Sequence, residues 1–340
     1  MAVVTLVLLA ACTNMRWVEP ADEQPTARPT AKPVPATGLR RGINLGNWLD
    51  APALGEWGVD ILPEYFTLIR QAGFDSVRIP VRFSAHAQTE PPYTLDEDFL
   101  EIVDAAVQHG LENGLNVILD FHHYDELMAA PAAHVTRFLA IWGQLAERYS
   151  GKPATLYFEL LNEPYGQLDA ATWNDLLGKA VGIIRTSNPN RWIIIGGADY
   201  SSIRALQDLR FPVDERLIAA FHFYEPFEFS HQGASWVPDS GSWVGINWKG
   251  TDKEKKDITD LLDEADGWSR QHGVPLMMGE FGAIARADES SRRTWTSFVA
   301  EQAGKRGIPW VYWDLCGEFA LFNCESGDWD QSMLDALTSK

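Results

Sequence analysis

The sequence predicts a single α/β domain built as a (β/α)8 barrel, the TIM-barrel fold, and three observations lead to this prediction. From residue 41 onward, apolar and β-rich runs alternate with helix-like stretches, which is the pattern of parallel strands joined by helical crossovers. We find eight β-rich runs, the number that closes a parallel sheet into a barrel. Polar residues gather at the carboxyl ends of these runs, where barrels of this type carry their functional groups.

The predicted elements follow one another in a regular order. The expected strands are Gly42–Leu45, Ser76–Val81, Val117–Phe121, Thr155–Leu161, Trp192–Ile195, Leu217–Tyr224, Pro275–Gly279 and Trp310–Trp313. The expected helices are Leu62–Gln71, Leu95–Asn113, His134–Tyr149, Ala171–Thr186, Ile203–Leu209, Lys253–His272 and Ser290–Arg306. Glycine or proline marks many boundaries, as at Gly73, Gly114 and Pro189. An open, doubly wound sheet is the alternative, but no glycine-rich phosphate loop follows an early strand, which favours the barrel.

The N-terminal segment differs in composition from the barrel. Residues 1–19 are expected to be an export segment, because Ala2–Ala11 is an apolar run too short to span a bilayer. The run ends in Leu9-Ala10-Ala11-Cys12, which resembles the lipobox of bacterial lipoproteins and makes Cys12 the candidate lipidation site. An ordinary secretory signal is the alternative. We therefore expect an exported protein, anchored by lipid to a membrane or cell surface or in the periplasm, and otherwise secreted.

Residues 20–38 are expected to be a disordered linker, and residues 39–340 the barrel domain. The linker contains Ala and Thr together with five prolines, at positions 20, 25, 29, 33 and 35. Such a stretch is largely extended, so the chain between Cys12 and Leu39 could reach about 80 Å at ~3.1 Å per residue. Membrane contact is expected only through the lipid at Cys12.

The overall charge limits the classes of partner. The chain has a formal net charge of −19 and a sequence pI of about 4.8, which argues against nucleic acids and anionic polymers. A hydrophobic content of 46% is ample for one core, and we expect a monomer. The 14 Trp and 9 Tyr residues offer flat faces that stack on sugar rings as well as filling cores.

Two glutamates stand at the ends of expected strands, in Leu161-Asn162-Glu163-Pro164 and in Met278-Gly279-Glu280-Phe281-Gly282. A strand buried on both faces should stay apolar to its end, so a carboxylate there needs a polar task. Two such carboxylates facing one cleft are the equipment for acid/base and nucleophilic attack on a glycosidic bond. The alternative is a pair of rim carboxylates neutralised by arginines.

Other strand ends carry polar or aromatic residues as well. They are Asn44, Asn47 and Trp48, then Arg78, then Asp120, His122, His123 and Tyr124, then His222 and Tyr224, and finally Trp313 and Asp314. The fifth strand gives a weaker signal, Gly196-Gly197-Ala198-Asp199-Tyr200. Each has a structural alternative: Arg78 as an ion-pair partner, His122 as a core histidine, Trp313 as a barrel plug. Their common position is what favours one functional cleft.

These residues resemble glycoside hydrolase family 5, a retaining family built on (β/α)8 barrels. The resemblance rests on Arg78, His122, Asn162-Glu163-Pro164, His222 with Tyr224, Glu280 and Trp313, and runs from about Arg41 to the C-terminus. The chain looks closest to bacterial enzymes with mixed endoglucanase and β-mannanase activity, through Gly42–Asn47, Phe227–Gly233 and Gly279–Ala283. Those relatives often have glutamate in place of Asp50 and tryptophan in place of Tyr200, which leaves the substrate preference open.

The resemblance implies a role for each residue. Glu280 would be the nucleophile, kept ionised by Arg78 and by a hydrogen bond from Tyr224, and Glu163 the acid and then the base. Asn162 would bind the 2-hydroxyl of the sugar, His122 and His222 would orient carboxylates and hydroxyls, and Trp313 would form the floor of the subsite. The remaining substrate-binding or supporting candidates are Asn47, His123, Tyr200, His231 and Trp236.

We expect no cofactor and no metal site. Adjacent histidines on a strand point to opposite faces, so His122 and His123 should not share one ion easily, although the rule loosens at a strand end. No Gly-x-Ser-x-Gly elbow precedes a helix, which argues against a serine hydrolase. Cys316 and Cys324 are either disulfide-bonded or free buried thiols.

The sequence thus predicts a retaining endo-β-1,4-glycanase of the cellulase type, acting on β-1,4-linked polysaccharide or oligosaccharide. Mannanase action as the main activity, or a silent carbohydrate-binding lipoprotein, are the alternatives. A barrel aldolase is disfavoured because no lysine stands at a strand end. The long stretch Phe227–Asp252, with Trp236, Trp243 and Trp248, is expected to form a cleft wall that stacks on sugars, with a hydrophobic mini-core as its alternative.

Overall fold

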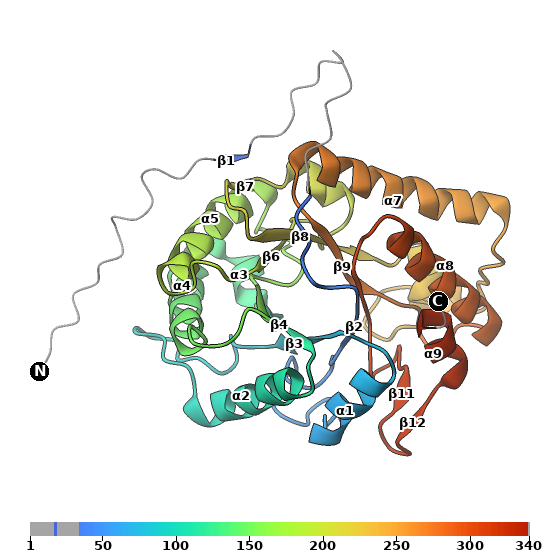
Figure 1. The fold of residues 1–340 in the computed structure, drawn as a ribbon, viewed down its shortest axis with the longest axis horizontal. Helices are drawn as coiled ribbons and strands as arrows, with labels where there is room; N and C mark the ends of the chain where they lie inside the picture. Colours follow the sequence, from blue (N-terminus) through green and yellow to red (C-terminus); the bar gives the residue numbers. More distant parts are fainter. Residues whose placement is uncertain (1–16, 19–33, 339–340) are drawn as a thin grey trace, which may run out of the picture.

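The structure is a closed barrel of eight parallel strands surrounded by helices (Figure 1), as the sequence predicts. It is a computed structural model that describes residues 17–18 and 34–338. The barrel strands follow the order β10-β2-β3-β4-β5-β6-β8-β9 around the ring. They are β2 Arg41–Asn44, β3 Ser76–Val81, β4 Asn116–Phe121, β5 Leu156–Glu159, β6 Ile193–Gly196, β8 Leu217–Phe223, β9 Leu276–Phe281 and β10 Trp310–Tyr312.

Alternate residues of each strand point into the barrel, and this places polar groups above apolar ones. In β4, Ile118 belongs to the apolar cluster inside the barrel, and Asp120, two residues later, is fully buried at the carboxyl end. In β5, Tyr157 and Glu159 are related in the same way. The residues between them, such as Leu119, pack into the larger core between sheet and helices. The lower half of the barrel is therefore filled by apolar side chains, and its upper end by polar ones.

The pairing of β8 with β9 changes register next to Glu280. Phe221 pairs with Met278, whereas His222 pairs with Glu280, so Gly279 is an extra residue in β9. Inside the barrel, Met277 is therefore followed by Glu280 rather than by Gly279. A Cβ atom at Gly279 would lie 3.1 Å from His222 Nε2, so β9 approaches this side chain closely at the extra residue.

Helices cover the outside of the ring. They are α1 Pro63–Gln71, α2 Glu97–Glu112, α3 Asp125–Ala129, α4 Pro131–Arg148, α5 Ala170–Ser187, α6 Phe227–Ser230, α7 Asp252–His272, α8 Glu289–Lys305 and α9 Gln331–Thr338. Helix α7 begins with a capping box between Thr251 and Glu254 and ends at Gly273 in the left-handed conformation, so local chemistry fixes both of its ends. Among the described residues, no helix combines the length and the apolar character that a membrane span needs.

The structure differs from the sequence prediction at a few elements. The helix expected over Ile203–Leu209 is a short 3-10 helix, η1 Arg204–Asp208, followed by the extended pair β7 Phe211–Pro212. The short helices α3 and α9 were not expected, nor was the hairpin of β11 Phe322–Asn323 and β12 Asp328–Trp329. Cys316 and Cys324 form a disulfide just before and inside this hairpin, which decides between the two alternatives for these residues.

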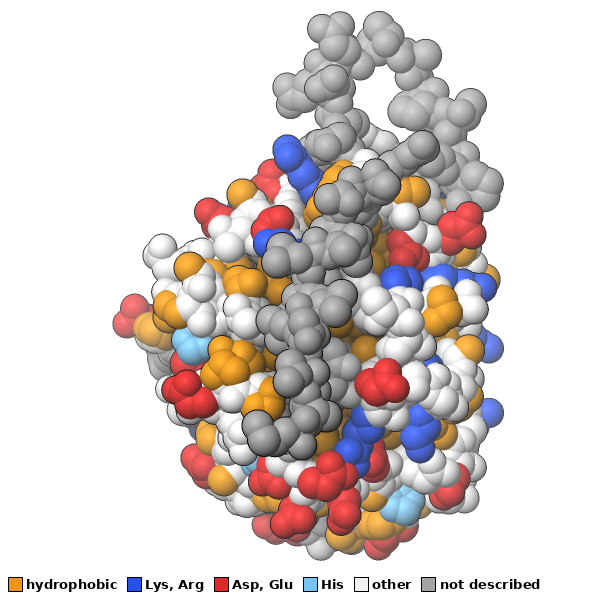
Figure 2. Space-filling model, turned by 90° about the vertical axis from the view of Figure 1, so that its left-hand side faces the viewer, with side chains coloured by type: hydrophobic (Ala, Val, Ile, Leu, Met, Phe, Trp, Pro, Cys, Tyr) orange, Lys and Arg blue, Asp and Glu red, His pale blue; other side chains and the backbone are white. Residues whose placement is uncertain are grey.

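The chain ends meet the barrel at defined places. Strand β1, Trp17–Val18, pairs antiparallel with β7, while Cys12 and most of the expected linker lie outside the described residues. At the other end, Arg41 of β2 donates a hydrogen bond of 3.1 Å to the carbonyl of Thr338 in α9. On the face drawn in Figure 2, acidic side chains are spread over the surface and interspersed with lysines and arginines, consistent with the negative net charge.

Candidate active site

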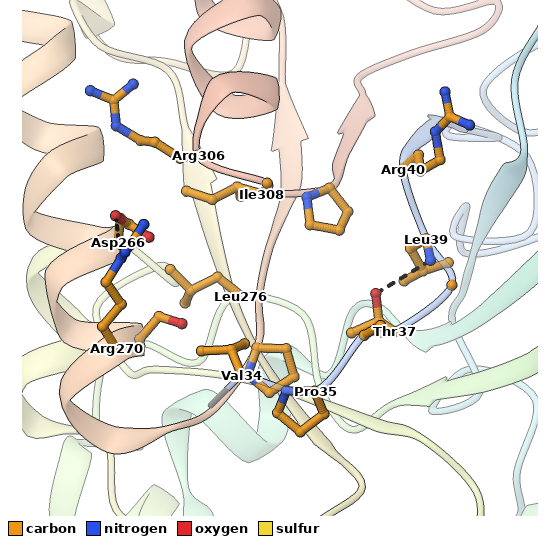
Figure 3. A pocket seen from close by; sticks show the side chains of 16 residues that line it. Val34, Pro35, Thr37, Leu39, Arg40, Asp266, Arg270, Leu276, Arg306 and Ile308 are labelled. Atoms are coloured by element: carbon orange, nitrogen blue, oxygen red, sulfur yellow. Dashed lines mark hydrogen bonds and ion pairs between the residues drawn. The ribbon is translucent and has the colours of Figure 1, made fainter. Parts of the chain in front are cut away.

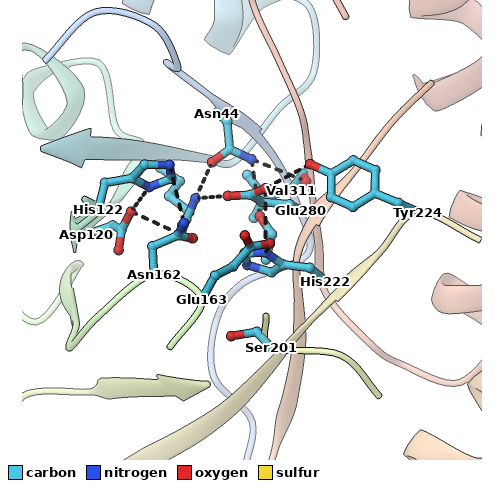
Figure 4. Close-up of polar contacts among 12 residues, drawn as sticks. Asn44, Asp120, His122, Asn162, Glu163, Ser201, His222, Tyr224, Glu280 and Val311 are labelled. Atoms are coloured by element: carbon cyan, nitrogen blue, oxygen red, sulfur yellow. Dashed lines mark hydrogen bonds and ion pairs between the residues drawn. The ribbon is translucent and has the colours of Figure 1, made fainter. Parts of the chain in front are cut away.

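Side chains from several strands converge at the polar end of the barrel, among them Asn44, Asp120 and Glu280 (Figure 4). The buried side chain of Arg78 contacts all three. Arg78 of β3 is bidentate to Glu159, at 2.7 and 2.9 Å, and lies 3.0 Å from Asp120. Its Nη1 also donates to the Asn44 amide oxygen at 2.9 Å and to Glu280 Oε1 at 2.8 Å. A planar guanidinium suits this arrangement because it offers five fixed donors. The sequence left open that Arg78 is only a structural ion-pair partner. This interpretation is incomplete, because Arg78 also contacts Glu280, a candidate catalytic carboxylate.

Glu280 is buried and bonded at both carboxylate oxygens. Oε1 accepts from Arg78, and Oε2 accepts from the hydroxyl of Tyr224 at 2.8 Å. Burial alone would raise the pKa of Glu280, but the nearby charges of His222 and Arg78, together with the Tyr224 hydrogen bond, outweigh it and hold this pKa well below its usual value. The side chain is thus kept ionised, as a nucleophile must be.

Glu163 follows β5 in a tight turn with a left-handed backbone, φ 44°. Its Oε1 lies 2.6 Å from His222 Nδ1, and the same nitrogen lies 3.5 Å from Glu280 Oε2. Burial raises the pKa of Glu163; the His222 contact partly offsets this, and the negative charge of Glu280 adds to it. A carboxylic acid with a raised pKa is suited to donate a proton.

The two glutamates therefore face each other across His222 with opposite tendencies to ionise. One ligand atom from each of Glu163, His222 and Glu280 can be chosen so that all lie within 4.8 Å of one another. Retaining glycosidases have carboxyl groups about 5–5.5 Å apart, and inverting ones about 6.5–9.5 Å. The spacing is that of the retaining class.

A second group of side chains lies beside the pair. Asn162 accepts a hydrogen bond of 2.9 Å from Arg78 Nη2, and its amide nitrogen lies 3.4 Å from His122 Nε2. His122 Nδ1 contacts Asp120 at 2.5 Å, and the imidazole ring stacks on Trp313 with ring centres 5.5 Å apart. Burial lowers the pKa of His122 to about 4, so the ring is neutral at neutral pH.

The loops after β2 and β10 are joined by Asn47 and Asp314. Asn47 has φ 65°, and its amide donates to Asp314 Oδ2 at 2.7 Å. Asp314 is fully buried, and the same oxygen accepts from the backbone of Gly317 at 3.0 Å. The peptide bond between Trp313 and Asp314 is cis. Asp314, the residue after Trp313, thus ties the loop after β10 to the loop after β2 through Asn47.

The rim of the site carries exposed aromatic rings. Tyr200 is 53% exposed and stacks on Tyr165 at 4.9 Å, and Trp236 is 56% exposed beside Phe319. The remaining candidates of the rim are more covered: His231 is buried and stacks on Phe227, and His123 is half-buried with the edge of Trp57 against it. The prediction that Trp248 belongs to a sugar-binding cleft wall is wrong. Its side chain is only 2% exposed and packs on Phe298 of α8.

His122 and His123 fall under the exception that the sequence analysis made for strand ends. Strand β4 ends at Phe121, so the alternation of side chains no longer applies, and donor atoms of Asp50, His122 and His123 lie within 4.8 Å of one another. Asp50 takes a backbone hydrogen bond from Trp48 at 2.9 Å, and burial raises its pKa. The expectation that the site works without a metal stays a prediction.

A separate hollow of about 610 Å³ lies at the opposite end of the barrel (Figure 3). It is lined by residues at or just before the starts of strands, such as Leu39, Leu276 and Ile308, together with Arg270 and Arg306. Barrels of this type carry their active sites at the carboxyl ends of the strands. This hollow is therefore distinct from the polar cluster around Arg78.

Sequence analysis missed one member of the cluster and gave two others no role. Glu159, beside Arg78, was not expected at all, whereas Asn44 and Asp120 were expected only as polar residues at strand ends. The amide of Asn44 donates to the carbonyl of Gly279 at 3.1 Å, and Asp120 also lies beside Arg78. A signal was present for Glu159, because it interrupts the apolar run Leu156–Leu161 and a buried charge needs a partner. Nothing in the sequence alone indicates that this partner is Arg78.

Comparison with known proteins gives a consistent result. The family model described as cellulase (glycosyl hydrolase family 5) matches residues 32–319. The chain is similar to Endoglucanase H of Acetivibrio thermocellus, with 35% identity over 302 residues, covering 87% of this chain and 32% of that protein. It thus spans about a third of that relative, and it covers 50% of Endoglucanase 3 of Fibrobacter succinogenes, at 28% identity and over 83% of this chain.

A solved structure resembles the chain over nearly its whole length. Endoglucanase Cel5A from Thermotoga maritima has 43% sequence identity and a TM-score of 0.87, and the match covers 88% of this chain and 97% of that one. The same endoglucanase has also been solved in complex with mannotriose and with cellobiose.

Proposed function

Because the chain belongs to glycosyl hydrolase family 5, we propose that it is a retaining endo-β-1,4-glucanase that cleaves internal bonds of β-glucan. The observation that carries the proposal is the pair Glu163 and Glu280, which share His222 and have pKa values shifted in opposite directions. Two close carboxyl groups, one protonated and one ionised, are what double displacement at a sugar requires.

In the first step, the ionised Glu280 attacks the anomeric carbon while Glu163 gives its proton to the leaving oxygen. The bond from Arg78 and the bond from Tyr224 hold the Glu280 carboxylate in a fixed orientation. The product is a glycosyl ester of Glu280 and a shortened chain with a free hydroxyl. Water then attacks the ester, Glu163 takes its proton, and Glu280 leaves as the carboxylate.

The change in charge at Glu280 suits Glu163 to both steps. Formation of the ester removes the negative charge that helps to raise the pKa of Glu163. The pKa of Glu163 therefore falls in the intermediate, where the residue acts as a base. In this proposal Asn162, held by Arg78, bonds the 2-hydroxyl, and Trp313, stacked on His122, lies under the bound sugar.

Mannan is a second candidate substrate. A relative with 43% identity has been solved with mannotriose as well as with cellobiose, which favours a cleft that accepts both sugars. The silent binding protein is disfavoured because both Glu163 and Glu280 are present and bonded to their partners.

The test is to incubate the purified protein with soluble β-1,4-glucan, glucomannan and galactomannan and to measure new reducing ends. We expect a rapid fall in viscosity relative to reducing ends, which marks internal cleavage, and retention of the anomeric configuration by NMR. Glu280→Gln should remove activity on every substrate, whereas Glu56→Gln, a control at an exposed carboxylate, should not. An inverted product, or no product from any of the polymers, would contradict the proposal.

We propose in addition that the protein is exported and anchored by lipid at Cys12. The support is the segment Leu9-Ala10-Ala11-Cys12 after an apolar run. An anchored enzyme would meet a polymeric substrate outside the cell. The alternative is a secreted protein that loses this segment.

A further inference from the structure

The connection between β6 and β8 lacks the α-helix that usually covers a parallel crossover. The stretch between Gly196 and Leu217 forms only η1 and the extended pair β7. Helix α5 lies alongside: Asn174 donates to the carbonyl of Asp208 at 2.8 Å and accepts from the backbone of Arg210 at 3.1 Å. Extended backbone on the outside of a domain has an edge that needs a partner.

The partner comes from the N-terminal part of the chain. Trp17 pairs with Pro212, and Val18 with Phe211, in antiparallel register. Figure 1 shows β1 beside β7 and next to α5, far along the sequence from both. This short strand covers the edge of the connection in which a helix is missing.

Helix α5 has a recess for the indole ring of Trp17. Gly178 is buried in the middle of α5, and a Cβ atom there would lie 2.3 Å from Trp17 Cη2, which no side chain permits. Glycine inside a helix destabilises it by about 0.5–1 kcal/mol relative to alanine. The contact with the indole of Trp17 gives a reason for glycine at this position, because alanine would clash with the ring. By contrast, a Cβ at Gly143 of α4 would meet nothing closer than 3.8 Å.

We propose that Trp17–Val18 is a permanent part of the folded barrel, a strand that closes the β6–β8 connection. It follows that the mature chain retains Trp17 and that any N-terminal processing occurs upstream of it. This proposal does not depend on the glycanase activity. If the lipid is carried by Cys12, only four residues, and so five residue steps, separate it from the docked Trp17. The barrel would then be held within about 17 Å of the lipid, at ~3.3 Å per residue, instead of the 80 Å of a free linker.

The docking position also orients the cleft. Strand β7 comes just before Leu217, the first residue of β8, and so lies toward the end of the barrel opposite to Glu163 and Glu280. An anchor at this place holds the protein by its flank and leaves the carboxyl ends of the strands open to a polymer.

Trypsin provides a clean test on the full chain. Within the first 39 residues, the basic residues are Arg16, Arg28 and Lys32, and the last two precede prolines, where trypsin does not cut. Cleavage in this segment therefore reports on the bond between Arg16 and Trp17. We expect Gly178→Ala to speed this cleavage at least tenfold, because the new methyl group displaces the indole, and Gly143→Ala to leave it unchanged. Equal rates in the wild type and in Gly178→Ala would overturn the proposal.

Three further measurements guard against a folding defect, a wrong strand pairing and a wrong N-terminus. Hydrolysis of soluble β-glucan should be the same in Gly178→Ala and in the wild type, which shows that the barrel is intact; if the wild type has no activity, circular dichroism serves instead and the trypsin result still stands. Hydrogen exchange at Phe211 should become at least tenfold faster in Trp17→Ala, and unchanged exchange would contradict the pairing. Mass spectrometry of protein from the natural host should show a chain that contains Trp17; a mature chain that begins after Val18 would also refute the inference.

Discussion

At the scale of single residues, neighbouring carboxyl groups of the site have pKa values shifted in opposite directions, upward at Glu163 and downward at Glu280. Arg78 contacts Glu159, Asp120 and Glu280. Glu280 also accepts a hydrogen bond from Tyr224. Burial raises the pKa of Asp120 to about 7, with Arg78 lowering it in part. The ionised state is thus concentrated where the nucleophile is needed.

The pH dependence of kcat/KM should be bell-shaped. Activity needs Glu280 ionised, and its lowered pKa of about 2 places the rise of the acid limb below the usual range of carboxylates. Activity also needs Glu163 protonated, so it falls as the pH rises through the raised pKa of that residue. With a dinitrophenyl substrate, whose leaving group needs no proton, we expect the wild-type enzyme to lose this basic limb. A basic limb that persists on the dinitrophenyl substrate would mean that a group other than the proton donor Glu163 sets it.

The two glutamates should respond differently to removal. Glu280→Ala should abolish turnover without unfolding the protein, and azide in the vacated space should yield a glycosyl azide of inverted configuration. Glu163→Ala should lower kcat on polysaccharide about 10²–10⁴-fold but leave the first step fast with a dinitrophenyl substrate, because that leaving group needs no proton. Burst kinetics and product NMR measure both effects, and identical defects on both substrates would show that the assigned roles are wrong.

At the scale of helices and strands, close approach at glycines sets how the outer layer packs. A Cβ atom at Gly110 of α2 would lie 2.5 Å from Val117 Cγ2 of β4, so this helix contacts its strand through a glycine. Gly143 of α4 has more space, with nothing nearer than 3.8 Å. The same substitution should therefore have opposite effects at the two positions.

Gly110→Ala should lower the free energy of unfolding by about 1–3 kcal/mol, since the methyl group forces α2 away from β4. Gly143→Ala should leave it unchanged or raise it by up to about 1 kcal/mol through better helix propensity. Urea unfolding followed by circular dichroism measures both values. A stabilised Gly110→Ala variant would mean that α2 can shift at no cost.

Most elements could be predicted from the sequence because they are long and apolar. Strands such as Ile193–Gly196 are buried at every position, and this continuous burial is visible as an apolar run. The β6–β8 connection could not be predicted, because Ile203–Leu209 has the composition of a helix and the extended β7 depends on pairing with Trp17–Val18, about 190 residues away. The position of Glu280 was predictable, but not the register change at Gly279 that turns it inward.

At the scale of the whole molecule, the attachment of the protein decides where it can act. Cys12 lies outside the described residues, and its lipidation is a proposal based on Leu9-Ala10-Ala11-Cys12. Each buried methylene of a lipid contributes about 0.8 kcal/mol, so a cysteine with several acyl chains would partition firmly into a bilayer.

Cys12→Ser should therefore move active enzyme from the membrane fraction to the soluble fraction, with unchanged kinetics on soluble glucan. The comparison of activity in the two fractions, together with mass spectrometry of the mature N-terminus, measures this. Wild-type enzyme that is entirely soluble and has an unmodified Cys12 would favour the secretory signal instead.

The hydrogen bond between Arg41 and Thr338 shows that the barrel's first strand and its last helix meet. The two ends of the barrel domain therefore lie close together, and they lie at the end of the barrel opposite to the cleft. A short linker from residue 338 to the segment before Arg41, with new ends opened at the exposed turn around Gly327, should give a circular permutant that still closes its barrel. Such a rearranged chain would keep Glu163 and Glu280 in place but would lack Trp17–Val18, so it should leave the edge of β7 uncovered.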